Sequence, residues 1–178
     1  MLFKIAVVGG ECTGKTTLCE MLAGELPALC VVEYLRELVD RERRVPLARD
    51  QAGILTTQIE REAAAVAAAR GRKRWVVCDS APIATAIYSE MYFDDRSLSA
   101  AAAAHHASYA FTLLTDVDLA WEADGLQRDG PGVRGDFHAR IRAWLQTQGA
   151  PFVLVSGDGE LRSAAAVTAL RALESRSR

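Results

Sequence analysis

Short apolar runs alternate along the chain with stretches in which apolar residues recur every three or four positions. The apolar runs have the length and the content of β-branched residues that are typical of buried parallel strands. They cover residues 3–8, 28–32, 75–78, 109–114 and 152–155. Because the stretches between them have helical spacing, the pattern predicts an α/β fold of three layers. A parallel sheet of about five strands would carry helices on both faces.

Capping residues and prolines indicate where the helices begin. We expect Asp50 to cap a long helix, and Ser80 to cap the helix that Pro82 begins near its first turn. Either Ser97 or Ser99 is expected to cap a further helix. The remaining helices are expected over about 16–23, 35–39, 137–145 and 160–173.

The segment from Gly9 to Thr16 fits the phosphate-binding pattern G-x-x-x-x-G-K-[ST] at every fixed position. It joins a predicted strand to a predicted helix, so successive backbone N–H groups and the helix N-terminus would face an anion. We expect Lys15 to reach the β- and γ-phosphates of ATP, and the Thr16 hydroxyl to hold Mg²⁺. The residues expected to bind the nucleotide are Gly10, Glu11, Cys12, Thr13, Gly14, Lys15, Thr16 and Thr17.

Acidic residues end the second and third predicted strands, at Glu33 and Asp79. Ligands of an open parallel sheet bind beyond the carboxyl ends of the strands, so both acids are expected beside the glycine loop. Asp79 is expected to hold Mg²⁺ or to cap the next helix, and either acid could take a proton from an attacking hydroxyl. Glu33 also opens the segment Glu33-Tyr34-x-Arg36-Glu37, which we interpret as an acceptor-binding segment or as a solvated helical turn.

The chain turns polar and glycine-rich over about residues 115–136. A loop of this length is uncommon in a compact domain unless it is functional. We therefore expect a lid that excludes water and carries Arg128 and Arg134 as catalytic residues, whose charge would stabilise the migrating phosphoryl group. The alternative is an ordinary long loop.

Composition and charge narrow the class of protein and of partner. The 178 residues, half of them hydrophobic, are expected to form one P-loop kinase-like domain over residues 1–178. A formal net charge of −2 without a basic stripe argues against a nucleic-acid partner, and no signal peptide or membrane span is visible. The four cysteines lack metal-binding spacing, which favours thiols in a reducing cytosol. We expect a cytoplasmic protein with a small-molecule acceptor, and its oligomeric state stays open.

Four motifs follow one another in the chain. They are Gly9-Gly10-Glu11-x-Thr13-Gly14-Lys15-Thr16, Glu33-Tyr34-x-Arg36-Glu37, Asp79-Ser80 and Trp121-x-x-Asp124-Gly125-Leu126. Together they resemble the ribosylnicotinamide kinase (NadR-like) domain of bacterial NAD biosynthesis, a P-loop group also described as an AAA-type ATPase domain. The second and fourth motifs are more specific than the glycine loop. The sequence departs from the family where Gln127 replaces a frequent arginine, with Arg128 one place later.

The resemblance implies ATP- and Mg²⁺-dependent phosphorylation of a nucleoside 5′-hydroxyl, with nicotinamide riboside giving nicotinamide mononucleotide. It implies that Lys15 and Thr16 handle ATP and Mg²⁺ and that Trp121 contacts the base of the acceptor. The residues that it places toward the acceptor are Glu33, Tyr34, Arg36 and Asp79.

Other functions remain open at the level of sequence. A kinase for another nucleoside or hydroxylated metabolite would use the same chemistry with a different pocket. An NTP-hydrolysing regulatory switch or a module that only binds nucleotide would share the glycine loop. No N-K-x-D motif follows a strand, which argues against a GTPase. The sequence does not choose between ATP and another NTP, or between Glu33 and Asp79 as the general base.

Overall fold

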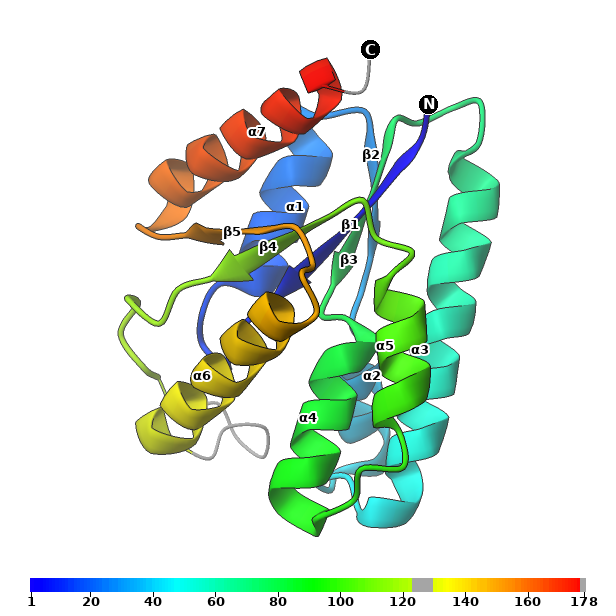
Figure 1. The fold of residues 1–178 in the computed structure, drawn as a ribbon, viewed down its shortest axis with the longest axis vertical. Coiled ribbons are helices and arrows are strands. Elements are labelled where there is room, and N and C mark those ends of the chain that lie inside the picture. Colours follow the sequence, from blue (N-terminus) through cyan, green and yellow to red (C-terminus); the bar gives the residue numbers. More distant parts are fainter. Residues whose placement is uncertain (123–129, 177–178) are drawn as a thin grey trace.

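The computed structural model describes residues 1–122 and 130–176 of the chain. Its centre is a parallel sheet of five strands in the order β2-β3-β1-β4-β5, as the apolar runs predict (Figure 1). The chain adds β2 and β3 on one side of β1 and then β4 and β5 on the other side. Ligands of open α/β sheets bind at such a reversal, outside the carboxyl ends of the strands. The strands are β1 (Phe3–Val8), β2 (Ala28–Val31), β3 (Trp75–Asp79), β4 (Phe111–Thr115) and β5 (Phe152–Val155).

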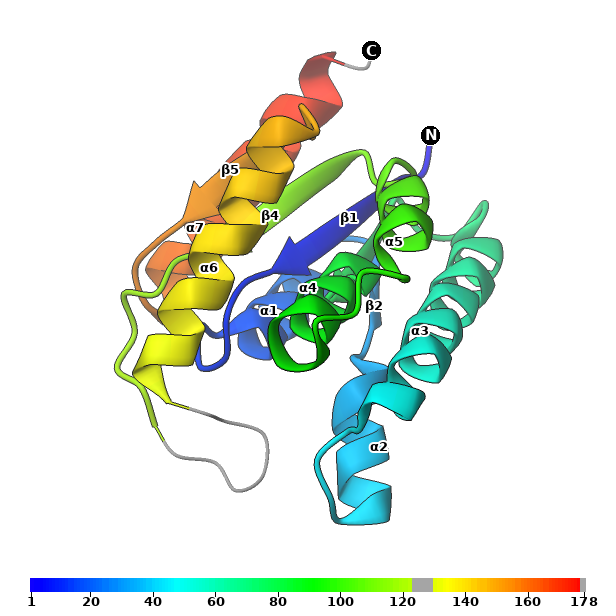
Figure 2. The same ribbon diagram turned by 60° about the horizontal axis from the view of Figure 1, so that its bottom comes forward.

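Helices cover both faces of the sheet within the described residues. Figures 1 and 2 show α1 and α7 on one face, with α3, α4, α5 and α6 on the other. The shorter α2 projects from the edge of the molecule at the carboxyl end of β2 (Figure 2). The helices are α1 (Lys15–Glu25), α2 (Tyr34–Glu42), α3 (Ala48–Ala69), α4 (Pro82–Phe93), α5 (Ser99–His106), α6 (Pro131–Thr147) and α7 (Gly159–Arg176).

The central strand β1 is buried on both faces, which explains its continuous apolar sequence. Ile5 and Val7 pack with residues of α1 and α7, whereas Ala6 and Val8 pack with residues of α3, α4 and α6. All four side chains are fully buried. The loop that follows β1 therefore begins at a strand that is packed between both layers of helices.

The expected helix starts are wrong at several positions. The helix α3 begins at Ala48, so Asp50 lies in its first turn and not at its cap. The Asp50 carboxylate accepts the backbone N–H of Leu47 over 2.8 Å, which is a capping contact made from inside the helix. A hydrogen bond from Arg44 lowers the pKa of Asp50 to about 2, and the Leu47 N–H acts in the same direction.

The expected serine caps are also wrong. The residue before α4 is Ala81 and the residue before α5 is Leu98, and neither cap carries a side-chain hydrogen bond. The helix α6 begins at Pro131, because proline fits the first turn of a helix. The predicted bounds of the loop, 115–136, are therefore too wide at both ends. Its last residues form the first turn and a half of α6, and its first residue ends β4.

No helix in the described part of the chain is both long enough and apolar enough to cross a membrane. The same residues contain no group of three or more histidine, cysteine or acidic side chains that would hold a metal ion by themselves.

Candidate active site

The glycine loop leaves β1 at Gly9 and enters α1 at Lys15. Inside the loop, the Gly10 carbonyl accepts hydrogen bonds from Lys15 Nζ and from Thr13 Oγ1, each over 2.7 Å. Gly14 has a φ of 72°, in the left-handed region that favours glycine. A Cβ atom on Gly9 would lie 2.1 Å from the Thr115 hydroxyl, so glycine is needed at this position for the loop to pack this closely on the end of β4.

Thr16 and Asp79 come together at the start of α1. The Thr16 hydroxyl donates to Asp79 Oδ2 over 2.6 Å, and Asp79 is 2% exposed. The other oxygen, Oδ1, is buried without a hydrogen-bond partner among the described residues. A hydroxyl and a carboxylate with a spare oxygen are the hard ligands that Mg²⁺ prefers, so this pair fits the ion that P-loop kinases use.

Glu33 follows β2 and precedes the first residue of α2. Removal from water raises the pKa of its carboxyl group, and the nearby Asp79 acts in the same direction. The positive charge of Lys15 and a hydrogen bond with Ser80 oppose this shift without cancelling it. Glu33 is therefore an acid whose pKa is moved toward the range in which a general base works.

A cavity of about 390 Å³ lies beside the loop and joins Lys15 and Glu33 to an apolar wall. Its volume is in the usual range for pockets that hold small molecules. The neutral polar residues in its lining are Ser80, Thr85 and Gln51. The apolar residues in its lining include Leu35, Val39, Pro46, Ala84, Tyr88, Tyr92 and Phe93.

Sequence reasoning missed the part of this wall that α4 provides. Thr85, Tyr88 and Tyr92 recur at helical spacing, which also describes an ordinary core face. In the structure Tyr88 stacks on Phe137 with ring centroids 4.2 Å apart, and on Tyr92 over 5.8 Å. The available signal was that aromatic residues follow Asp79 on the helix that leaves the site.

Tyr34 and Arg36 lie apart from the cavity. The backbone N–H of Tyr34 donates to Gln58 Oε1 over 2.9 Å, and the guanidinium of Arg61 lies over the Tyr34 ring at 4.7 Å. Arg36 is exposed, and neither residue is in the described cavity lining. The structure thus brings Glu33 to the site and turns Tyr34 toward α3.

Trp121 packs against the glycine loop. Its Nε1 donates to Glu11 Oε1 over 2.9 Å, and the backbone N–H of Gly130 donates to the same oxygen over 3.0 Å. The thiol of Cys12 donates to the Glu122 carbonyl over 3.1 Å. Two loop residues expected to bind nucleotide therefore also contact the segment that contains Trp121.

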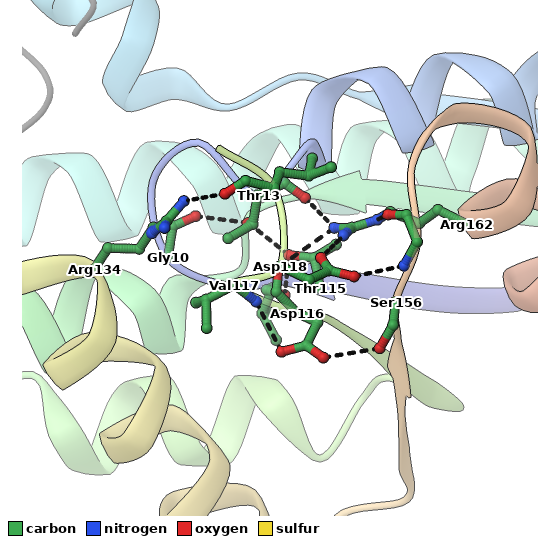
Figure 3. A network of polar contacts seen from close by, with 12 residues as sticks. Gly10, Thr13, Thr115, Asp116, Val117, Asp118, Arg134, Ser156 and Arg162 are labelled. Atoms are coloured by element: carbon green, nitrogen blue, oxygen red, sulfur yellow. Dashed lines mark hydrogen bonds and ion pairs between the residues drawn. The ribbon is translucent and has the colours of Figure 1, made fainter. Parts of the chain in front are cut away.

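Arg134 lies at the start of α6 and is 9% exposed. Its Nη1 donates to the Leu119 carbonyl over 2.9 Å. A Cβ atom on Gly10 would lie 2.8 Å from Arg134 Cγ, so this side chain packs directly on the loop (Figure 3). Thr17 is exposed in the first turn of α1. Arg128 and the motif residues Asp124, Gly125 and Leu126 lie outside the described residues.

Comparisons with known proteins agree with this architecture. The AAA domain family matches residues 4–162. The structure of NadR protein in complex with NR has a TM-score of 0.77 at 22% identity, and covers 97% of this chain and 51% of that chain. NadR protein in complex with NAD and AMP-PNP gives 0.77 at 20% identity, with 97% and 49% covered. The chain thus spans about half the length of the NadR structures.

Two kinase structures that are matched over nearly their whole length share the fold as well. Thymidylate kinase from Ehrlichia chaffeensis has a TM-score of 0.68 at 15% identity, covering 95% of this chain and 98% of that chain. Deoxyadenosine kinase from M. mycoides with bound dATP gives 0.62 at 12% identity, with 95% and 99% covered. No curated protein sequence matches the chain. The fold is that of P-loop nucleoside and nucleotide kinases, and the chain belongs to the AAA domain family that its residues 4–162 match.

Proposed function

We propose that this protein is an ATP- and Mg²⁺-dependent kinase that phosphorylates a hydroxyl of a small nucleoside-like acceptor, with nicotinamide riboside as the favoured acceptor. The observation that carries the proposal is the cavity whose lining combines Lys15 and Glu33 with the aromatic residues of α4. Such a cavity offers charged groups for a reacting hydroxyl and apolar side chains for a flat ring.

The nucleotide side of the proposal rests on Lys15, Thr16 and Asp79. Lys15 would leave the Gly10 carbonyl, which it contacts over 2.7 Å, for the negative charge of the β- and γ-phosphates. Thr16 and Asp79 would hold Mg²⁺ through the hydroxyl and the unpaired Oδ1. The ion, when bound, supplies positive charge that stabilises the transferring phosphoryl group.

The proposed reaction moves one phosphoryl group from ATP to the acceptor. The Glu33 carboxylate takes the proton of the acceptor hydroxyl while the hydroxyl oxygen forms a bond to the γ-phosphorus. The bond between that phosphorus and its bridging oxygen breaks, and ADP leaves with the electron pair. The products are ADP, a phosphate ester and a proton on Glu33. Its raised pKa supports this role, whereas Asp79 is already bonded to Thr16.

The identity of the acceptor is proposed from two sources. The motif resemblance implies nicotinamide riboside, and the similar fold of NadR protein in complex with NR supports a nucleoside-like ligand. The walls at Tyr88 and Tyr92 suit a planar base, because aromatic faces stack favourably on one another. A different nucleoside would use the same charged residues with other contacts to the aromatic side chains.

The proposal is tested by identifying the product. The protein is incubated with ATP, Mg²⁺ and nicotinamide riboside, and the mixture is examined by mass spectrometry for nicotinamide mononucleotide. Lys15→Met is the matched control, because it removes the charge and keeps much of the side-chain volume. Product from the wild type and none above background from Lys15→Met is expected. ADP without any phosphorylated acceptor would instead indicate an NTP-hydrolysing switch.

A further inference from the structure

A buried arginine on α7 contacts the outside of the glycine loop. Arg162 is 2% exposed, and its Nη1 donates to the backbone carbonyl of Thr13 (Figure 3). Its Nε donates to the Gly157 carbonyl over 2.8 Å. Its Nη2 pairs with the Asp118 carboxylate. One guanidinium therefore joins α7, the segment after β4 and the segment after β5 to the loop that follows β1.

The ion pair is part of a closed ring of contacts. Asp118 Oδ2 accepts the backbone N–H of Gly157 over 2.6 Å, while the other oxygen of Asp118 binds Arg162. Ser156 Oγ adds a hydrogen bond to Asp116 Oδ2 over 2.8 Å in the same segments. The planar guanidinium of Arg162 has several N–H donors and can make all these contacts at once. Its pairing with Asp118 offsets part of the cost of burying the charge.

The contact with Thr13 has a geometric consequence for the next peptide group. The Thr13 carbonyl and the Gly14 N–H belong to one planar trans peptide, so they point in opposite directions. The hydrogen bond from Arg162 to the Thr13 carbonyl therefore holds the Gly14 N–H on the opposite side, toward the interior of the loop, where the phosphates are expected. The Thr13 side chain is fixed as well, because its hydroxyl contacts Thr115 Oγ1 over 2.7 Å.

We propose that Arg162, held by Asp118, is a positioning residue that orients the Thr13–Gly14 peptide for binding of nucleotide phosphate. Arg162 touches no substrate in this scheme and acts through the loop backbone. The inference rests on the proposed nucleotide-binding function and adds a residue that neither the loop motif nor the resemblance indicates. The sequence gives no signal for it, because a single arginine on a helix is more often a surface residue.

The test measures equilibrium binding of Mg·ADP by isothermal titration calorimetry, which needs no acceptor and no turnover. Arg162→Gln should raise the dissociation constant about tenfold, since a hydrogen bond to a charged donor that orders the site is lost. Arg162→Lys should restore part of the affinity, because it keeps the charge but not the fork. The amide signal of Gly14 in an NMR spectrum should shift in Arg162→Gln.

Ser163→Ala is the matched control. Ser163 is the next residue on α7, is 1% exposed and donates to Glu25 Oε1 over 2.8 Å, so its loss weakens α7 without touching the glycine loop. Its dissociation constant should stay within about twofold of the wild type even if its melting temperature falls. Equal affinities for wild type and Arg162→Gln would overturn the inference, because a purely structural arginine lowers stability alone.

A second variant keeps the test decisive if Arg162→Gln does not fold. Asp118 is one-third exposed, so Asp118→Asn is expected to fold, and it removes the charge that holds Arg162. It should weaken Mg·ADP binding several-fold, and unchanged binding would contradict the inference. A wild-type protein that binds no Mg·ADP would overturn both the proposed function and the inference. A wild type that binds, with variants that bind equally well, would overturn the inference alone.

Discussion

The Thr16 hydroxyl donates a hydrogen bond to Asp79 Oδ2 over 2.6 Å and so joins the first turn of α1 to the carboxyl end of β3. The two residues are 63 positions apart in the sequence. Their contact leaves Asp79 Oδ1 buried and without a partner in the described part of the chain. A buried carboxylate oxygen that finds no protein donor is an arrangement that a cation would complete.

Asp79→Asn should lower kcat by about a hundredfold or more, because a metal ion contributes several kcal/mol to stabilising the transition state. The asparagine oxygen can still accept the Thr16 hydroxyl, so the melting temperature should change by only a few degrees. ADP release is measured across a Mg²⁺ titration, and EDTA should abolish it in the wild type. Wild-type Mg²⁺ dependence in the variant would leave Asp79 with a purely structural role.

Glu33 should make activity and stability respond to pH in opposite directions. Its pKa is raised by removal from water, so wild-type kcat should fall as the pH falls through that pKa and the base is protonated. Glu33→Gln should lose about a hundredfold in kcat at pH values above the Glu33 pKa, and the difference from wild type should shrink at lower pH, where the wild-type base is protonated.

The stability effect of Glu33 has the opposite sign. A carboxyl with a raised pKa in the folded state favours folding below its unfolded pKa, and loses that contribution as the pH rises through the folded value. Glu33→Gln cannot ionise, so its melting temperature relative to wild type should rise between about pH 4 and pH 8. A constant difference across that interval would contradict the raised pKa.

Substitution of Tyr92 tests whether the acceptor binds against the aromatic residues of α4. It should disturb the fold little, because the side chain lines the cavity and is 46% exposed. Tyr92→Ala should raise the KM for the acceptor about tenfold and leave the KM for ATP unchanged, since an aromatic stacking contact is worth about 0.5–1.5 kcal/mol beyond the area it buries. Tyr92→Phe keeps the ring and should behave like wild type. A larger effect on ATP than on the acceptor would place the acceptor elsewhere.

Substitution of Glu62 tests a contribution to the stability of the fold and not to the activity. Its fully buried carboxylate accepts hydrogen bonds from the Tyr109 hydroxyl over 2.7 Å, contacts His105 Nε2 over 2.7 Å and pairs with Lys4 over 3.1 Å. Burial raises the pKa of Glu62, but these partners outweigh it and hold the pKa below its ordinary value. Its contribution to stability is therefore present above the unfolded pKa and is lost as the pH falls through the folded pKa.

Glu62→Ala should lower the free energy of unfolding by about 3–5 kcal/mol at neutral pH, because it leaves Lys4 without its buried partner. Urea denaturation at pH 7 and pH 4 measures this loss, which should shrink at the lower pH. Glu60→Ala is the control, since Glu60 is exposed on the same helix. A Glu62→Ala variant as stable as Glu60→Ala would show that the cluster contributes nothing to the fold.

Local patterns are enough to predict the sheet and the glycine loop. The strand at 152–155 has the predicted bounds, because a short apolar run between turn residues is long enough for a strand and too short for a helix. The loop is predictable because its backbone requirements fix glycine, lysine and threonine at set positions. Boundaries were harder: Asp50 caps α3 from within its first turn, a placement that residue type alone does not distinguish from the cap itself.

The strand ends that meet beside the glycine loop could be predicted, but individual side-chain contacts between other distant segments could not. Trp121 and Glu11 are 110 residues apart, and nothing in either local sequence pairs an indole with a loop carboxylate. Tyr88 and Tyr92 have the spacing of any core helix, and only the position of α4 beside the sheet end makes them a wall of the cavity. These relationships depend on how the layers of helices and strands pack, which the local pattern of apolar and polar residues does not specify.

The most direct measurement is a coupled ADP-release assay with ATP and Mg²⁺, run without acceptor and then with nicotinamide riboside and a panel of other nucleosides. Release well above the background is expected with nicotinamide riboside, and this release should be lost in Lys15→Met and Asp79→Asn. Release with another nucleoside alone would keep the kinase and change the acceptor. ADP release that is the same with and without every acceptor would contradict the proposed transfer of phosphate to a small acceptor.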